Sequence, residues 1–222
     1  MLITDRLRAA IFDLDGTVVD NMSLHAEAFA VFAERHGLAA LTSADRAKLD
    51  GRRNSEIFPV LFGREMPREE WLAYEHEKEG LYRELSRGRL TLVAGLPALL
   101  ERLATDGVAV ALATSAPALN VAHTLSEVGL AGAFPTVVRG DQVPNGKPAP
   151  DVFLEASRQL DVAPVGCVVF EDAPMGITAA RAAGMRVVAI TSSFSAAHLA
   201  ALADPPDLAC GDFDAFLAMA SW

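Results

Sequence analysis

Short apolar runs recur along the chain and alternate with stretches of helical spacing. The runs are "AAIFDLD" (9–15), "VAVALATS" (108–115), "TVVRGD" (136–141), "CVVFED" (167–172) and "RVVAIT" (186–191). The stretches of helical spacing include residues 97–105, 118–129, 151–160 and 174–183. Strands that are apolar throughout are buried on both faces, and strands that alternate with helices form βαβ units. The pattern predicts an α/β fold with a doubly wound parallel sheet covered by helices.

Residues 18–90 interrupt this alternation. They contain no convincing strand and several amphipathic helices, and the main pattern returns at "RLTLVAGLP" (89–97). We therefore predict a core domain made of residues 1–17 and 91–222, and a helical cap domain, residues 18–90, inserted after the first strand. Because the insertion follows a strand end, the cap is expected to cover that end of the sheet.

Polar residues stand at the carboxyl ends of the predicted strands. They are Asp13, Asp15, Thr114, Ser115, Lys147, Glu171 and Asp172. Ligands of open parallel α/β sheets bind outside those strand ends, so four separate segments point their polar groups into one crevice. Carboxylates gathered there repel each other unless a cation lies between them, and an all-oxygen site suits Mg²⁺. The lysine and hydroxyl groups would hold an anion, for which phosphate is the natural candidate.

These residues form the segments "DLDGT" (13–17), "TS" (114–115), "GKP" (146–148) and "ED" (171–172), which resemble the four signature motifs of the haloacid dehalogenase (HAD) superfamily. The resemblance spans nearly the whole chain and includes a helical cap after the first motif. Within the superfamily, "GKPAPDVFLEA" and "VVFEDAPMGITAARAAGM" resemble the β-phosphoglucomutase-like branch. The expected fold is thus a Rossmann-like HAD core with an α-helical cap.

The resemblance implies a role for each motif residue. Asp13 would attack phosphorus and form an aspartyl-phosphate, and Asp15 would be the general acid and base. Mg²⁺ would be held by Asp13, Asp172, Glu171 and the backbone carbonyl of Asp15. The phosphoryl oxygens would be bound by Thr114, Ser115 and Lys147.

A carboxylate at position 15 separates branches of the superfamily. Members without it include dehalogenases and P-type ATPases, so the resemblance implies a phosphohydrolase or phosphomutase. We predict a Mg²⁺-dependent phosphatase for a small phosphorylated metabolite, a sugar or polyol phosphate. The alternatives are a β-phosphoglucomutase, a phosphoglycolate phosphatase and an inorganic pyrophosphatase. Two other classes remain open, a phosphoacceptor signalling domain and a binding protein without catalysis, although the long insert and Asp15 argue against the first.

Substrate specificity is expected to lie in the cap. His25 and Lys78 occupy otherwise apolar helical stripes, which suggests a polar cavity facing the acids, and the resemblance places both near the acid/base residue. The cap loop "DGRRNSE" (50–56) corresponds to the specificity loop of the branch, and Arg52 or Arg53 would hold a distal part of the substrate. Aligning Gly51 puts Asn54 where the mutase has an arginine for its second phosphate. This departure favours hydrolysis.

Charge and composition exclude several partners. The 222-residue chain has a formal net charge of −10 and no Lys/Arg cluster of the size that nucleic acids need. No apolar run approaches the roughly 20 residues of a membrane span. The two cysteines, Cys167 and Cys210, lie in or beside strand-like stretches and are expected to be reduced. We predict a soluble cytoplasmic enzyme, a monomer or weak dimer, that binds no nucleic acid and no membrane.

Overall fold

A single parallel sheet forms the centre of the molecule. The computed structural model describes residues 7–220, so the first six and last two residues of the predicted core domain lie outside the described residues. Within that range six strands follow the order β3-β2-β1-β4-β5-β6. They are β1 (Ala9–Phe12), β2 (Ala109–Thr114), β3 (Thr136–Arg139), β4 (Cys167–Glu171), β5 (Arg186–Ile190) and β6 (Leu208–Cys210). Five of them coincide with the predicted runs, whereas β6 is too short to show a pattern.

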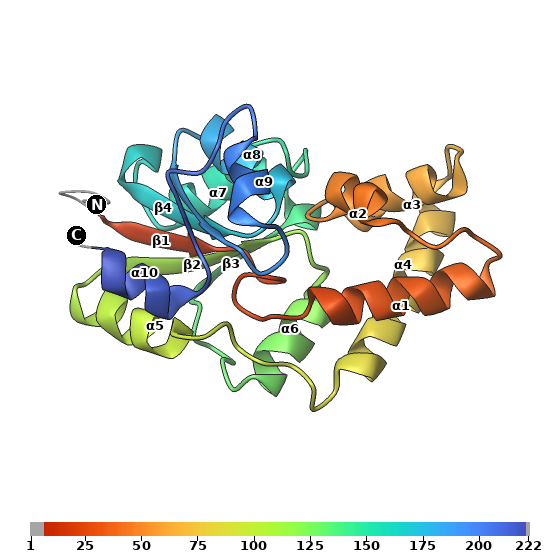
Figure 1. The fold of residues 1–222 in the computed structure, drawn as a ribbon, viewed down its shortest axis with the longest axis horizontal. Helices are drawn as coiled ribbons and strands as arrows, with labels where there is room; N and C mark the ends of the chain where they lie inside the picture. The colour runs from red at the N-terminus through yellow and green to blue at the C-terminus, as the bar shows by residue number, and fades with distance from the viewer. Residues whose placement is uncertain (1–6, 221–222) are drawn as a thin grey trace.

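Helices cover both faces of this sheet (Figure 1). They are α5 (Leu96–Thr105), α6 (Ala118–Glu127), α7 (Asp151–Gln159), α8 (Pro174–Ala182), α9 (Ala196–Ala200) and α10 (Phe213–Met219), with 3-10 turns η1 (Gly140–Gln142) and η2 (Pro164–Gly166). Local sequence explains several helix starts. Pro174 occupies the first turn of α8, where no backbone N–H is needed, and the side chain of Asp212 accepts a hydrogen bond from the Ala215 N–H at the start of α10.

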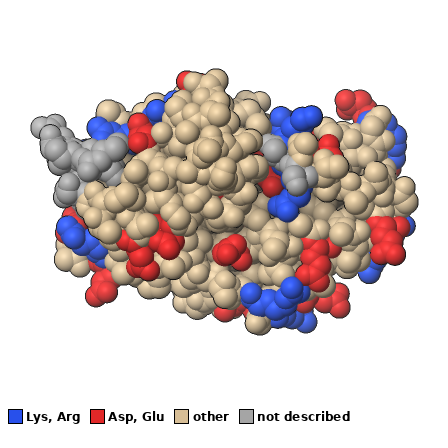
Figure 2. Space-filling view, in the orientation of Figure 1, with Lys and Arg blue, Asp and Glu red and all other residues tan. Residues whose placement is uncertain are grey.

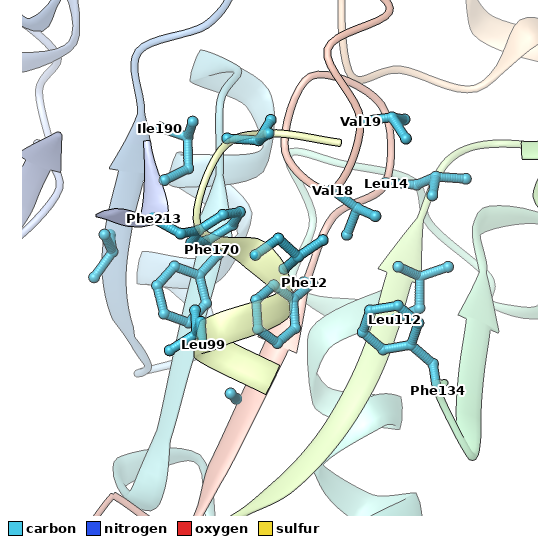
Figure 3. Close-up of a cluster of buried hydrophobic side chains, with 14 of the residues drawn as sticks. Phe12, Leu14, Val18, Val19, Leu99, Leu112, Phe134, Phe170, Ile190 and Phe213 are labelled. Atoms are coloured by element: carbon cyan, nitrogen blue, oxygen red, sulfur yellow. The ribbon is translucent and has the colours of Figure 1, made fainter. Parts of the chain in front are cut away.

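Alternate residues of the strands point to opposite faces of the sheet. Phe12 and Phe170 lie on one face, where their rings stack at 4.8 Å between centroids and Phe213 of α10 packs edge-on against both (Figure 3). Ile11 and Val169 lie on the other face, under α7 and α8. Both faces are therefore closed to water, and each fully buried aromatic or branched side chain contributes roughly 1.5–3 kcal/mol.

The cap consists of four helices beside the sheet, on the right in Figure 1. They are α1 (Met22–Arg35), α2 (Ser43–Leu49), α3 (Asn54–Phe62) and α4 (Arg68–Ser86). A separate apolar cluster holds them together, in which Phe32 of α1, Phe58 of α3 and Tyr82 of α4 are fully buried. The α/β core with an inserted helical segment is confirmed. The exact domain boundaries, at residues 17/18 and 90/91, stay a prediction.

The surface carries scattered charge. On the face seen in Figure 2, basic side chains lie in small groups among acidic ones. Among residues 7–220, no helix combines the length and apolar character that crossing a membrane requires.

Candidate active site

The predicted site residues meet because three neighbouring strands end together. β1 pairs with β2 on one side and with β4 on the other. Asp13 follows β1 directly, Thr114 is the last residue of β2, and Glu171 is the last residue of β4. Lys147 reaches the same point from the loop after β3. All four residues are buried, at 7% exposure or less.

Lys147 joins two of the acids. Its Nζ donates to Oδ1 of Asp13 at 2.6 Å, to Oε1 of Glu171 at 2.7 Å and to the Ala113 carbonyl at 3.3 Å. Burial lowers the pKa of Lys147, but attraction to the two carboxylates outweighs this and holds the pKa above its ordinary value. The ammonium group therefore stays charged although almost no water reaches it.

Asp13, Glu171 and Asp172 form a cluster whose ligand oxygens all lie within 4.8 Å of one another. Burial raises the pKa of Asp13 to about 8 against the attraction of Lys147, and burial together with the other two acids raises the pKa of Asp172. The single positive charge of Lys147 is thus too small to balance the negative charge of the three carboxylates. Clustered carboxylate oxygens are what a hard divalent cation binds, so these residues fit such an ion.

The three acids differ in how many hydrogen bonds their carboxylate oxygens accept. Oε2 of Glu171 accepts hydrogen bonds from the backbone N–H groups of Asp172 and Ala173, at 2.8 and 2.9 Å, while its Oε1 accepts from Lys147. Ser193 donates to Asp172, a contact that nothing in the sequence indicated. Glu171 therefore holds Lys147 and the strand end in place, and Asp13 and Asp172 have more lone pairs left for an ion.

Two glycines make room for these carboxylates. A Cβ on Gly16, which has φ +80°, would lie 2.1 Å from Oδ2 of Asp172. A Cβ on Gly176 would lie 1.6 Å from Oε1 of Glu171. Side chains at either position are incompatible with the acids as they stand, so Gly176, which no sequence motif indicated, belongs to the site.

Asp15 lies outside the acidic cluster, and its carboxylate contacts the cap. Oδ1 of Asp15 accepts a hydrogen bond from Nδ2 of Asn21 at 2.6 Å and lies 3.4 Å from Nε2 of His25. Burial raises the pKa of Asp15, but His25 and Asn21 more than offset it and the pKa is lowered. Asp13 and Asp15, two residues apart in the chain, thus have opposite pKa shifts.

The two polar residues on the cap stripes lie together behind Asp15. Nδ1 of His25 is 2.9 Å from Nζ of Lys78, which donates to Oε1 of Glu79 at 3.0 Å. The His25 ring stacks on Tyr82 at 3.8 Å between centroids, and Tyr82 Oη accepts from Asn21 at 2.6 Å. Asn21, Glu79 and Tyr82 were not predicted. Tyr82 lies four residues after Lys78, on the same side of α4, which was the available signal.

The two hydroxyl groups at the end of β2 have different hydrogen-bond partners. Oγ1 of Thr114 accepts the Ala116 N–H at 3.0 Å, so its own proton remains available to an anion. Ser115 Oγ instead donates to the carbonyl of Gly51 at 2.6 Å. Gly51, which lies in the loop predicted to set substrate specificity, thus also fastens that loop to the core.

The two neighbouring arginines of the cap loop point in different directions. Arg52 lines the cavity above the acids. Arg53, the other candidate from the sequence, is not among the residues that line it. Its guanidinium binds Glu56, at 3.0 and 2.7 Å, and the carbonyls of Gly140, Val143 and Pro144 in the core, at 3.3–3.4 Å. Arg53 therefore connects cap and core, because its long side chain reaches acceptors that only the fold brings near.

A cavity extends from the strand ends to the cap. Its core end is lined by Asp13, Asp15, Thr114, Ser115 and Asp172, and its cap end by His25, Asp50, Arg52, Asn54, Lys78 and Glu79 with apolar side chains of α1–α3. Burial raises the pKa of Asp50, partly opposed by Arg46. A carboxylate beside a buried lysine, a second carboxylate held by the cap and a cluster of acidic oxygens that fits a divalent cation are compatible with an enzyme that acts on phosphorylated ligands.

Comparison with known proteins agrees with this class. Residues 10–190 match the haloacid dehalogenase-like hydrolase family, to which the chain belongs. It is 32% identical over 193 residues to the phosphorylated carbohydrates phosphatase of Thermotoga maritima, covering 85% of this chain and 88% of that protein. It is 31% identical over 191 residues to the β-phosphoglucomutase of Bacillus subtilis, covering 83% of each.

A solved structure shares the fold. The crystal structure of a HAD hydrolase, family IA, variant 3, from Entamoeba histolytica superimposes with a TM-score of 0.84 at 30% identity, covering 93% of this chain and 94% of that one. The predictions of a HAD fold in the β-phosphoglucomutase-like branch and of an enzyme of the HAD phosphatase type are confirmed at the level of the family.

Proposed function

We propose that this protein is a Mg²⁺-dependent phosphomonoesterase that hydrolyses small phosphorylated carbohydrates through an aspartyl-phosphate on Asp13. The observation that carries the proposal is the opposite environment of its two aspartates. Asp13 is held against Lys147 and the acidic cluster, whereas Asp15 is held by Asn21 and His25 of the cap segment. Carboxylates with distinct surroundings suit distinct roles, here a nucleophile and a proton carrier.

In the first step an Asp13 oxygen attacks phosphorus and the bond to the leaving oxygen breaks, while Asp15 gives that oxygen a proton. An approaching phosphate repels ionised Asp15 and raises its pKa, which favours its carrying that proton. In the second step Asp15 takes a proton from water, which attacks the aspartyl-phosphate and releases phosphate. Lys147 and the Thr114 hydroxyl bind the phosphoryl oxygens and the charge that develops on them.

The acidic cluster is the proposed place for the metal ion. Asp13 and Asp172, with Glu171 and the Asp15 carbonyl as further oxygen donors, would hold Mg²⁺ there. When bound, the ion supplies charge neutralisation between the carboxylate nucleophile and the phosphate.

The name of the Thermotoga maritima relative supports a carbohydrate phosphate as substrate. The cap end of the cavity supports hydrolysis over mutase chemistry. A mutase must bind a second phosphate at this end. Asn54 instead donates to Oε1 of Glu79 at 2.8 Å, and Arg53 donates to the Gly140 carbonyl of the core, so neither side chain is directed at such a phosphate. The buried Glu79 would also repel a second phosphate at that end.

A phosphate-release assay tests the proposal. The purified protein with Mg²⁺ is offered a panel of sugar and polyol monophosphates, phosphoglycolate and pyrophosphate, and Asp13→Asn is the control for contaminating activity. We expect phosphate release from carbohydrate monophosphates that EDTA abolishes. Phosphorus NMR with β-glucose 1-phosphate addresses the alternative: glucose 6-phosphate without free phosphate would establish the mutase instead.

A further inference from the structure

The cap loop presents two charged side chains to the cavity on either side of one glycine. Asp50 and Arg52 flank Gly51, which has φ +87°. The Gly51 carbonyl accepts from Ser115 Oγ of the core at 2.6 Å, so the loop is fixed directly above the end of β2. In Figure 1 this loop, between α2 and α3, lies at the side of the cap that faces the sheet. The two side chains therefore have a defined position relative to the catalytic centre.

One carboxylate oxygen of Asp50 accepts a hydrogen bond, and the other does not. Oδ2 accepts from Nη2 of Arg46 at 3.1 Å, and the same Nη2 donates to the Met22 carbonyl of α1 at 3.3 Å. The carboxylate is thus held between α1 and α2, with its side chain 13% exposed. Among the side chains that the structure describes, no donor reaches Oδ1. The cavity therefore contains a fixed, mostly buried acceptor without a donor.

Arg52 presents the complementary group. Its Nε is buried and has no hydrogen-bond partner among the described residues. Its neighbour Arg53 takes up the nearby acceptors, Glu56 and the core carbonyls. A buried donor without an acceptor is destabilising, so Arg52 favours a ligand that supplies an oxygen.

We propose that Asp50 and Arg52 together bind hydroxyl groups at the distal end of the substrate through hydrogen bonds, and that Asp50 is the specificity-determining residue. This inference rests on the proposed phosphatase function. A second phosphate or a carboxylate only accepts hydrogen bonds, so it would satisfy Arg52 but leave Asp50 unpaired and repelled. An amine only donates, so it would leave Arg52 unpaired. A hydroxyl group donates and accepts, and a pair of adjacent hydroxyls serves both side chains at once.

The substrate class that follows is a monophosphate whose far end is neutral and hydroxylated. The side chains of Asp50 and Arg52 carry opposite charges, and the nearby Lys78 is balanced by Glu79 at 3.0 Å. With Arg46 counted beside Asp50, these groups carry one net positive charge, and the carboxylate of Asp50 would repel a second anion placed next to Arg52. Sugar acids and bisphosphates are therefore expected to be poorer substrates than neutral polyol phosphates.

Three six-carbon monophosphates test this directly. Glucitol 6-phosphate carries neutral hydroxyls, 6-phosphogluconate adds a carboxylate, and hexyl phosphate lacks both. We expect the wild-type protein to have the highest kcat/KM on glucitol 6-phosphate. Asp50→Asn should lower that value about 10- to 100-fold, mainly through KM, as expected for a lost charge-assisted hydrogen bond. On hexyl phosphate kcat/KM should change less than about twofold, since no hydroxyl is read there.

Glu65→Gln provides the matched control, because it makes the same charge change on an exposed cap residue away from the cavity. It should behave as wild type on all three compounds. Equal losses on glucitol 6-phosphate and hexyl phosphate in Asp50→Asn, or a wild-type preference for 6-phosphogluconate, would overturn the inference while leaving the phosphatase function standing. If wild type released phosphate from none of the three compounds or the wider panel, the proposed function itself would fail.

Discussion

Asp15 is the residue whose surroundings differ most from those of a simple metal-site carboxylate. It accepts from Asn21 and lies beside His25, so it is held by the cap segment and not by the acidic cluster. We predict that Asp15→Asn lowers kcat about 10²- to 10⁴-fold with little change in KM, because an amide cannot carry the proton. Steady-state phosphate release and rapid-quench measurement of phosphoenzyme check this. Turnover equal to that of wild type would remove Asp15 from the acid/base role.

Asp50 gives a prediction about stability and pH. Its pKa is raised in the folded state because burial disfavours the charge, with Arg46 opposing. Above that pKa the ionised carboxylate therefore destabilises the fold relative to the unfolded chain, and the penalty disappears as the pH falls toward the ordinary Asp value of about 3.9. We expect Asp50→Asn to unfold at a higher temperature than wild type at neutral pH and at the same temperature near pH 4. Calorimetry across this pH range measures the difference, and a gain that grows toward low pH would contradict the assignment.

At the scale of elements, α4 of the cap and α6 of the core share a buried polar contact. Asn120 of α6 donates to Oε2 of Glu79 at 2.5 Å and accepts from Arg83 at 2.6 Å. Further along, Ser86 of α4 contacts His123 at 2.8 Å. Glu79 also accepts a hydrogen bond from Lys78. The Asn120–Glu79 contact therefore links the position of α6 to that of Lys78, which contacts His25.

Asn120→Ala should therefore cost more than Ser86→Ala. The first change leaves a buried carboxylate oxygen and a guanidinium without their partner, at about 1–3 kcal/mol for each unsatisfied group. The second removes one ordinary hydrogen bond, at about 0.5–1.5 kcal/mol. Urea unfolding of both variants makes the comparison. If Ser86→Ala proved equally costly, general contact between cap and core, and not the Asn120 network, would account for the effect.

At the scale of the whole molecule, a metal ion would tie the ends of β1 and β4 together. Binding to the folded state alone adds about 2.7 kcal/mol when free Mg²⁺ is 100 times its Kd. We expect Mg²⁺ to raise the Tm of the EDTA-treated wild-type protein and to have a much smaller effect on Asp172→Asn. Glu65→Gln should respond as wild type does. An equal rise in Asp172→Asn would place the ion outside the proposed cluster.

The sequence determined the sheet, the helical insert and the position of the core motifs. Apolar runs of strand length that alternate with helical stretches admit few other folds, and in a parallel sheet residues that end neighbouring strands must lie side by side. Asp13, Thr114 and Glu171 could therefore be brought together from local patterns alone. The stripe positions of His25 and Lys78 likewise indicated an inward polar pair.

Only the tertiary structure decided which cap residues reach the cavity and how the cap is held. Arg52 and Arg53 are neighbours of the same type, and a loop has no periodicity that would assign one to the cavity and the other to the core carbonyls. Asn120 and Glu79 are 41 residues apart, and their contact depends on how two helices of separate layers meet. The position of the cap on the core depends on such distant pairs, because their geometry is set by packing between elements and not by the pattern within any one of them.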